Sequence, residues 1–196
     1  MPDEGELNDV RELAHQALLT SQVDPMTLAI AAHSLAKVSR EYDIALSAMD
    51  RALHLNQNSA DILIRSGWLR NWVSDADLAI EHFKRSIRLN PIDPEKGFAV
   101  GGLSLAYIEK GDYSEALSYA RQTKRAMPRW LSGWVFGAVA AAYCGKVEEA
   151  REAVSKILTI SPGYSIASRT ASSPNRDSWV EDQIAHGLRR AGLPEG

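Results

Sequence analysis

The chain has 196 residues, of which 45% are hydrophobic and 24% charged, with a net charge of −3 and a pI near 6.0. This balance is ordinary for a globular protein and gives no overall attraction to nucleic-acid phosphates or anionic membranes. Cys144 is the only cysteine, which excludes an intramolecular disulfide and a zinc site built from several cysteines. The polar, acidic N-terminus is unlike a signal peptide, and the longest apolar run, 134–144, is too short to span a bilayer. We therefore expect a cytoplasmic protein with neither nucleic-acid nor membrane partners.

The first predicted helix lies at residues 6–19. Its apolar residues recur at helical spacing, and they are Leu7, Val10, Leu13, Ala14, Ala17 and Leu18. Because paired helices are predicted from Met26 onward, this helix stands where the second helix of an earlier pair would lie. We expect either that the chain was cut from a longer protein or that its start forms an irregular cap.

A repeat follows, with windows that begin at Met26, Ala60, Gly97 and Leu131, which are 34, 37 and 34 residues apart. Position 20 of every window is alanine: Ala45, Ala79, Ala116 and Ala150. Position 32 is proline in three of the four windows, at Pro91, Pro128 and Pro162. A period of 34 residues with two helices per unit indicates a repeat array.

The third window, "GDYSEALSYARQTKRAMP" at 111–128, shows how one unit is predicted to work. Gly111 suits the turn between two antiparallel helices, and Gly145 recurs at the same position of the fourth window. Ala116 and Ala120 lie on one helical face, where small side chains let the neighbouring helix approach closely. Pro128 then ends the unit, because it has no backbone N–H and clashes with the preceding turn.

On these residues the chain resembles a tetratricopeptide-repeat protein over 26–164. The resemblance implies an all-α solenoid of antiparallel helix pairs with a concave surface. Departures from the family pattern occur mainly in the first helix of each repeat. The usual glycine, tyrosine and tryptophan appear once each, as Gly67, Tyr107 and Trp134, and in the second repeat Arg70 replaces the tyrosine. The alternative is an unrelated helical bundle with chance spacing. The expected organisation is an N-terminal helix of an incomplete repeat in 1–25, four repeats at 26–59, 60–93, 97–130 and 131–164, and a C-terminal region at 165–196.

The C-terminal region is predicted to contain a serine-rich linker, 165–176, and a final helix. Ser178 and Glu181 match a capping box, and Gly192 with Pro194 supplies a stop signal. The apolar side of this helix is Trp179, Val180, Ile184 and Leu188. We expect the helix to cap the fourth repeat, and the alternative is that it occupies the groove.

The insertion "LNPIDP" and the tail "GLRRAGLPE", together with the repeats, resemble the C-terminal repeat region of bacterial class III adenylate or guanylate cyclases. Similar regions also follow winged-helix transcription regulators. The resemblance implies that the chain is a regulatory segment of a multidomain signalling protein.

No catalytic or metal motif is found in the sequence. The five histidines form no close ligand pair, "GGLSLAY" at 101–107 lacks the lysine of a phosphate loop, and no serine or cysteine nucleophile signature is present. His33 falls on a position that is predicted to face the core. We expect neither an enzyme nor a cofactor, and the alternative is an enzyme whose site carries no recognisable motif.

In the tetratricopeptide resemblance, the inner groove is lined by fixed positions of each first helix. The groove residues expected here are Ile30, Ile64, Arg65, Trp68, Asn71, Phe98, Leu105, Ile108 and Val135. Family members that hold a C-terminal carboxylate use basic and amide side chains in the groove, and only Arg65 matches that set. We therefore expect an apolar groove without such a clamp.

The function predicted from these features is non-catalytic binding of a peptide, a helix or a neighbouring domain in the apolar concave groove. Two alternatives stay open: a structural module that forms a homodimer through its N-terminal end, and the repeat arm of a winged-helix regulator.

Overall fold

The computed structural model describes residues 4–19, 24–93 and 95–196, and every regular element in these ranges is a helix. The expected all-α fold is confirmed. In chain order the elements are α1 (Glu4–Leu19), α2 (Pro25–Ser34), the π-helical turn η1 (Leu35–Ser39), α3 (Tyr42–Leu55), α4 (Ala60–Trp72), α5 (Ala76–Leu89), α6 (Lys96–Glu109), α7 (Tyr113–Ala126), α8 (Leu131–Tyr143), α9 (Val147–Ile160), α10 (Ile166–Ala171) and α11 (Ser178–Ala191).

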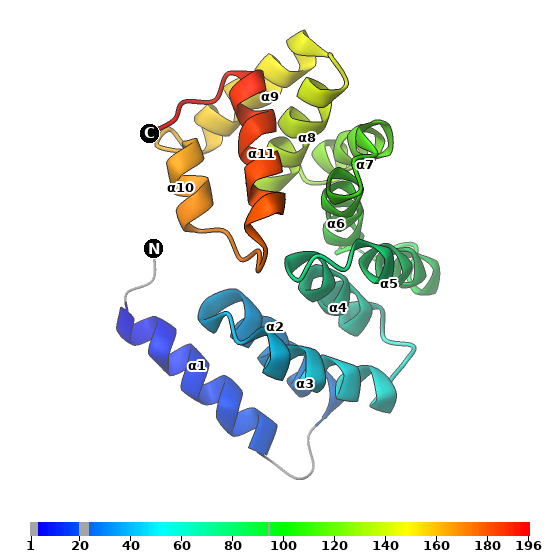
Figure 1. Ribbon diagram of the computed structural model, residues 1–196. Coiled ribbons are helices and arrows are strands. Elements are labelled where there is room, and N and C mark those ends of the chain that lie inside the picture. The colour runs from blue at the N-terminus through cyan, green and yellow to red at the C-terminus, as the bar shows by residue number, and fades with distance from the viewer. Residues whose placement is uncertain (1–3, 20–23, 94) are drawn as a thin grey trace.

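The helices pack in sequential pairs that follow a curved path. The pairs are α2 with α3, α4 with α5, α6 with α7, and α8 with α9, and each pair also contacts the next. Figure 1 shows the resulting arc, with α10 and α11 (orange and red) on its inner side, opposite α2 and α4. The inner face therefore has helices of the array on one side and the C-terminal region on the other.

The turn inside each helix pair has the same left-handed backbone. Gly111 and Gly145 have φ angles of 73° and 69°, as the glycine pattern predicts. Arg40 and Ser74 stand at the same position of the first two windows, and they have φ angles of 57° and 60° without the glycine. A left-handed residue after a helix satisfies its last carbonyl groups, and a non-glycine residue adopts it at a cost of about 1–2 kcal/mol.

The small residues of the second helices are buried where the helices of a pair meet. The alanines at position 20, which are Ala45, Ala79, Ala116 and Ala150, are each at most 1% exposed. Phe83 packs between two glycines of the first helices, since a Cβ atom at Gly67 or Gly102 would lie 2.6 Å or 2.1 Å from its ring. The absent side chains therefore make room for this ring in the core.

Helix α1 covers the start of the array with one face only. It packs on α2 and η1, where Ala14 is buried and Ala17 and Leu18 join the same apolar cluster. Val10 and Leu13, which the periodicity places on the apolar side, are exposed, and Leu13 is 65% exposed. The side chain of Leu7 lies outside the described set.

The C-terminal region differs from the sequence prediction in two respects. First, α10 lies inside the predicted linker, because Ser165 and Ser168 cap its N-terminus reciprocally. Second, the predicted capping box of Ser178 and Glu181 is wrong. Asp177 precedes the first turn of α11, its side chain forms no capping hydrogen bond, and the Glu181 carboxylate binds other partners.

Helix α11 packs mainly on α8 and less extensively on α9. Val180, Ile184 and Leu188 are buried as the periodicity predicts, whereas Trp179 is 48% exposed. Gly187 permits a close approach, since a Cβ atom there would lie 2.7 Å from Val139 of α8. The helix thus covers the inner side of the last pair.

Among the described helices, none combines the length and apolarity required to cross a membrane. Within the same described ranges, histidine, cysteine and acidic side chains form no group of three or more that could hold a metal ion.

Candidate functional site

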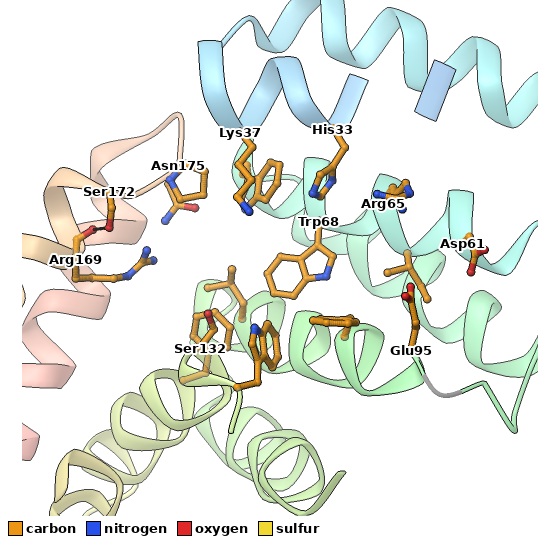
Figure 2. Close-up of a pocket in the computed structure, with 17 residues that line it drawn as sticks. His33, Lys37, Asp61, Arg65, Trp68, Glu95, Ser132, Arg169, Ser172 and Asn175 are labelled. Carbon is orange, nitrogen blue, oxygen red and sulfur yellow. Dashed lines mark hydrogen bonds between the residues drawn. The ribbon is translucent and has the colours of Figure 1, made fainter. Parts of the chain in front are cut away.

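A cavity of about 470 Å³ lies on the inner face of the arc. Helices α2, α4, α6 and α8 and the turn η1 supply most of its wall, and the region from α10 to the start of α11 supplies the rest (Figure 2). Such a volume is within the range of about 300–1,000 Å³ that is typical of ligand sites.

The apolar part of the cavity is a cluster of aromatic rings around Trp68 of α4. The Trp68 ring lies 5.9 Å from Trp130 and 6.3 Å from Phe136, measured between centroids, and 6.4 Å from Trp72. Phe98 of α6 packs edge-on against Trp130 at 5.2 Å. These spacings are those of favourable aromatic pairs, so the rings hold one another in place.

A glycine of α6 explains how Trp130 reaches the cluster. Trp130 directly precedes α8, and its ring lies over Gly101, where a Cβ atom would come within 2.3 Å of it. Gly101 therefore provides the space that the indole occupies, and the short connection after Pro128 brings the ring to the inner face.

His33 and two cations lie at the upper side of the cavity (Figure 2). The His33 ring packs on Trp72 at 4.7 Å, and its buried Nδ1 has no hydrogen-bond partner. Burial, together with the positive charges of Arg65 and Lys37, lowers the pKa of His33 to about 4. The imidazole is therefore neutral at physiological pH, and the positive charge there comes from Arg65 and Lys37.

Four charged side chains of the cavity wall form no ion pair among the described residues: Lys37, Asp61, Arg65 and Glu95. Figure 2 shows Lys37 on the side of the C-terminal region, and Asp61, Arg65 and Glu95 at the opposite end. A ligand in the cavity would meet charge of both signs.

The remaining part of the cavity wall comes from residues 172–177, between α10 and α11, which we call the strap. The Tyr42 hydroxyl donates a 2.7 Å hydrogen bond to the carbonyl oxygen of Pro174. The backbone N–H of Arg176 donates a hydrogen bond to the carbonyl oxygen of Trp72 at 2.6 Å. The Arg176 guanidinium lies 3.3 Å from the Asp43 carboxylate. The strap is thus fixed to the first two helix pairs across the cavity.

A buried carboxylate holds the other side of the strap. Glu181 of α11 accepts hydrogen bonds from Ser173 Oγ at 2.6 Å and from Asn175 Nδ2 at 3.1 Å. The guanidinium of Arg169 lies 3.1 Å from the same oxygen, Oε2. These contacts connect α10, the strap and α11, and they position Arg169 and Asn175 in the cavity wall.

The structure brings five of the predicted groove residues together in the cavity lining: Ile64, Arg65, Trp68, Phe98 and Leu105. The others lie elsewhere. Asn71 is fully buried and donates a 3.0 Å hydrogen bond to the carbonyl oxygen of Gly102, and Ile108 and Val135 are core residues. Ile30 is exposed outside the cavity.

The sequence pattern does not predict the contribution of the C-terminal region to the cavity, namely Arg169, Ser172, Pro174 and Asn175. These residues belong to no repeat, so periodicity cannot locate them. His33 was expected to face the core, whereas it lines the cavity with its ring against Trp72. The groove is also more polar than the expected apolar surface.

Comparisons with known proteins identify the fold but not a sequence family. No family model matches the chain, and no curated protein matches its sequence. Solved structures do match. PilW, described as a widely conserved type IV pilus biogenesis factor, has a TM-score of 0.72 at 15% identity, over 95% of this chain and 82% of PilW. PilF of Pseudomonas aeruginosa has a TM-score of 0.70 at 15% identity, over 96% of this chain and 82% of PilF.

A third structure carries the repeat name. YrrB, described as a TPR protein with an unusual peptide-binding site, has a TM-score of 0.58 at 22% identity, over 82% of this chain and 80% of YrrB. The chain has the tetratricopeptide-repeat fold. At these identities the similarity establishes the fold alone.

Proposed function

We propose that the chain is a non-catalytic interaction module whose aromatic cavity binds a short segment of a partner protein. One observation carries the proposal: Trp68, Phe98 and Trp130 line a cavity whose wall also holds charged groups without partners in the described chain. Aromatic anchors in a partly enclosed site are typical of binding hot spots. YrrB, the similar structure described by its peptide-binding site, is consistent with this use of the fold.

The strap favours a short extended segment over a helix. It lies across one side of the cavity, where a helix would have to continue. An extended chain could place one or two side chains among the rings.

Selection from a displayed random-peptide library tests this function. Peptides that bind the wild-type protein should bind the Phe98→Ala variant at least about fivefold more weakly, since loss of a hot-spot residue costs about 1 kcal/mol or more. Trp179→Ala is the matched control, because Trp179 is an exposed aromatic residue outside the cavity lining. The proposal would be contradicted if no peptide is recovered, or if both variants lose the same peptide affinity while circular dichroism shows that their fold is intact.

The biological setting is also a proposal. The tail "GLRRAGLPE" and the "LNPIDP" insertion support a regulatory segment of a cytoplasmic bacterial signalling protein, such as a class III adenylate cyclase, with a winged-helix regulator as the alternative. The full reading frame of the gene tests it, because a cyclase domain or a winged-helix domain would be encoded in the same frame.

A second candidate function, self-association through the N-terminal end, is favoured by the exposed apolar side of α1. Leu13 and Val10 are exposed there, and Leu19 is 85% exposed. Light scattering over a range of protein concentrations tests it. A mass that rises with concentration in the wild type and stays monomeric in Leu13→Glu would support this function, and a constant monomer mass would contradict it.

A further inference from the structure

The charges of the cavity are separated along its length. On the strap side are Lys37 and Arg169, and the charge of Arg169 is offset by Glu181. At the opposite end are the carboxylates of Asp61 and Glu95, with Arg65 on the same side, so that two negative charges and one positive charge lie there (Figure 2). The aromatic rings lie between the two ends. The wall is therefore net positive near the strap, net negative at the far end and apolar in the middle.

We propose that the partner segment is bipolar: a large apolar side chain seated among the rings, a carboxylate on the strap side and a basic group at the Asp61–Glu95 end. This inference rests on the proposed binding function and specifies its ligand. The carboxylate has two sources of the same chemistry, an acidic side chain or the carboxyl end of the partner chain.

The polar groups of the strap side fit a carboxylate. Lys37 supplies an uncompensated positive charge, Arg169 supplies N–H donors, and Ser132 supplies a hydroxyl group in the same part of the lining, whereas the Ser172 hydroxyl already donates a hydrogen bond to the backbone of α10. Arg169 Nε is buried without a hydrogen-bond partner, although its terminal nitrogen pairs with Glu181. Because a guanidinium has five N–H donors, Arg169 can bind a second carboxylate while it holds the first.

The surroundings of His33 are consistent with this assignment. Besides burial, the charges of Arg65 and Lys37 disfavour a proton on the imidazole, so their positive potential reaches the His33 ring at the upper side of the cavity. An anionic group bound near Lys37 would lie in this potential, and no other described side chain neutralises Lys37.

The geometry at the far end fits a basic group. Asp61 and Glu95 come from the starts of α4 and α6, on separate helices, and both side chains are exposed to solvent. A lysine or arginine side chain that leaves the aromatic part can place its charge between them. Extended chains advance about 3.3 Å per residue, so a basic residue two positions from the apolar one lies about 7 Å away.

Five synthetic peptides test the proposal by titration of tryptophan fluorescence, since Trp68, Trp72 and Trp130 line the cavity. The bipolar peptide is acetyl-Gly-Asp-Ala-Phe-Ala-Lys-Gly-amide. The neutral peptide has Asn and Gln in place of Asp and Lys, the acidic peptide has two Asp, and the basic peptide has two Lys. The fifth, acetyl-Gly-Lys-Ala-Phe with a free carboxyl end, replaces the acidic side chain by the chain terminus.

We expect the bipolar peptide to bind about threefold to tenfold more tightly than the neutral peptide at low salt, with the difference reduced at 0.5 M salt. Lys37→Glu should reverse the preference of the strap side, so that the basic peptide binds more tightly than the bipolar one. Glu95→Lys should favour the acidic peptide. Tighter binding of the fifth peptide than of the bipolar one would identify the chain terminus as the carboxylate source.

Matched control variants carry the same charge changes on α9, outside the cavity lining. Lys156→Glu and Glu152→Lys change exposed residues there and should leave the order of affinities unchanged. Equal binding of the bipolar and neutral peptides, with loss of both in Phe98→Ala, would overturn the bipolar ligand but keep the binding function. Absence of binding by every peptide, or variants that leave the order unchanged, would also overturn it.

Discussion

Tyr42, the first residue of α3, donates a 2.7 Å hydrogen bond to the carbonyl oxygen of Pro174, 132 residues later in the chain. This contact joins the first helix pair to the C-terminal region across the inner face. In a simple solenoid each repeat contacts only its neighbours. Here the strap adds a long-range contact, so the stability of the first pair depends partly on the C-terminal region.

Replacement of Tyr42 by Phe should loosen the strap without disturbing the helix pairs. The loss of one partly buried hydrogen bond is expected to lower the free energy of unfolding by about 0.5–1.5 kcal/mol. Amide hydrogen exchange in 172–177 should become faster, because local opening of the strap becomes easier. Tyr119→Phe is the control, since no side-chain hydrogen bond of its hydroxyl is found in the described chain. Unchanged exchange in the strap would show that the Tyr42 hydroxyl does not hold it.

The repeat phase could be predicted because it depends on local spacing. The position-20 alanines, such as Ala45 and Ala116, are buried as their recurrence indicates, since a helix pair must place small residues at its contact. The left-handed turns were predicted only at glycines. Arg40 and Ser74 adopt the same backbone, because the connection between two packed helices requires it whichever residue is present.

The candidate site could be predicted only where a repeat position supplies the residue. Trp68 and Phe98 follow from their positions on first helices, and both line the cavity. Asn175 does not, because its place depends on Glu181 and on contacts of the strap with the first two helix pairs. Contacts between distant segments without periodicity leave no local pattern in a single sequence. The same reason explains why α10 was predicted as linker.

Ala116→Leu should overpack the contact between α6 and α7. Ala116 is fully buried, and its carbonyl oxygen accepts a 2.9 Å hydrogen bond from Ser104 of α6, so the two helices are close at this point. The expected loss is about 1–3 kcal/mol in the free energy of unfolding, measured with urea. Ser118→Leu, at an exposed position of the same helix, should change it by less than about 0.5 kcal/mol. A stable Ala116→Leu protein would mean that the repeat register is different.

The titration of His33 and that of Glu109 should change the free energy of unfolding in opposite directions as the pH varies. Burial lowers the pKa of His33 from 6.5 to about 4, so between these values the unfolded chain binds a proton that the folded chain does not. Stability from His33 is therefore lost as the pH falls. Burial raises the pKa of Glu109 from 4.5 to about 7. Between these two pH values the folded chain therefore binds a proton that the unfolded chain does not. Stability from Glu109 is lost as the pH rises.

Single variants should separate the two effects between about pH 4.5 and 6.5. In Glu109→Gln, the free energy of unfolding should decrease more steeply on acidification than in the wild type. In His33→Gln, the free energy of unfolding should decrease as the pH rises. Each change is expected to be about 2–3 kcal/mol across the range. His82, whose pKa burial also lowers, contributes with the sign of His33. Urea unfolding at several pH values measures the slopes, and parallel slopes in both variants would contradict the assignment.

The Arg169–Glu181 pair should be strongly coupled because both groups are buried beside the cavity. The Arg169 side chain is 13% exposed and lies 3.1 Å from a carboxylate oxygen that also accepts from Ser173 and Asn175. Glu181→Gln leaves the guanidinium buried without its counter-charge, which is expected to cost about 3–5 kcal/mol. Arg169→Met should cost less, about 1–3 kcal/mol, because the carboxylate keeps its two neutral donors.

The double variant Arg169→Met/Glu181→Gln should be more stable than the sum of the two losses predicts, by about 0.5–3 kcal/mol, because it removes both charges together. Urea unfolding of the four proteins in the cycle measures this coupling. The exposed pair Arg189–Glu195 is the control, since an ion pair in solvent is worth about 0–1 kcal/mol. Hydrogen exchange in the strap gives a second readout, because Glu181 also holds Ser173 and Asn175. Additive losses, with the strap equally protected in all four proteins, would show that the pair neither stabilises α10 against α11 nor positions the cavity wall.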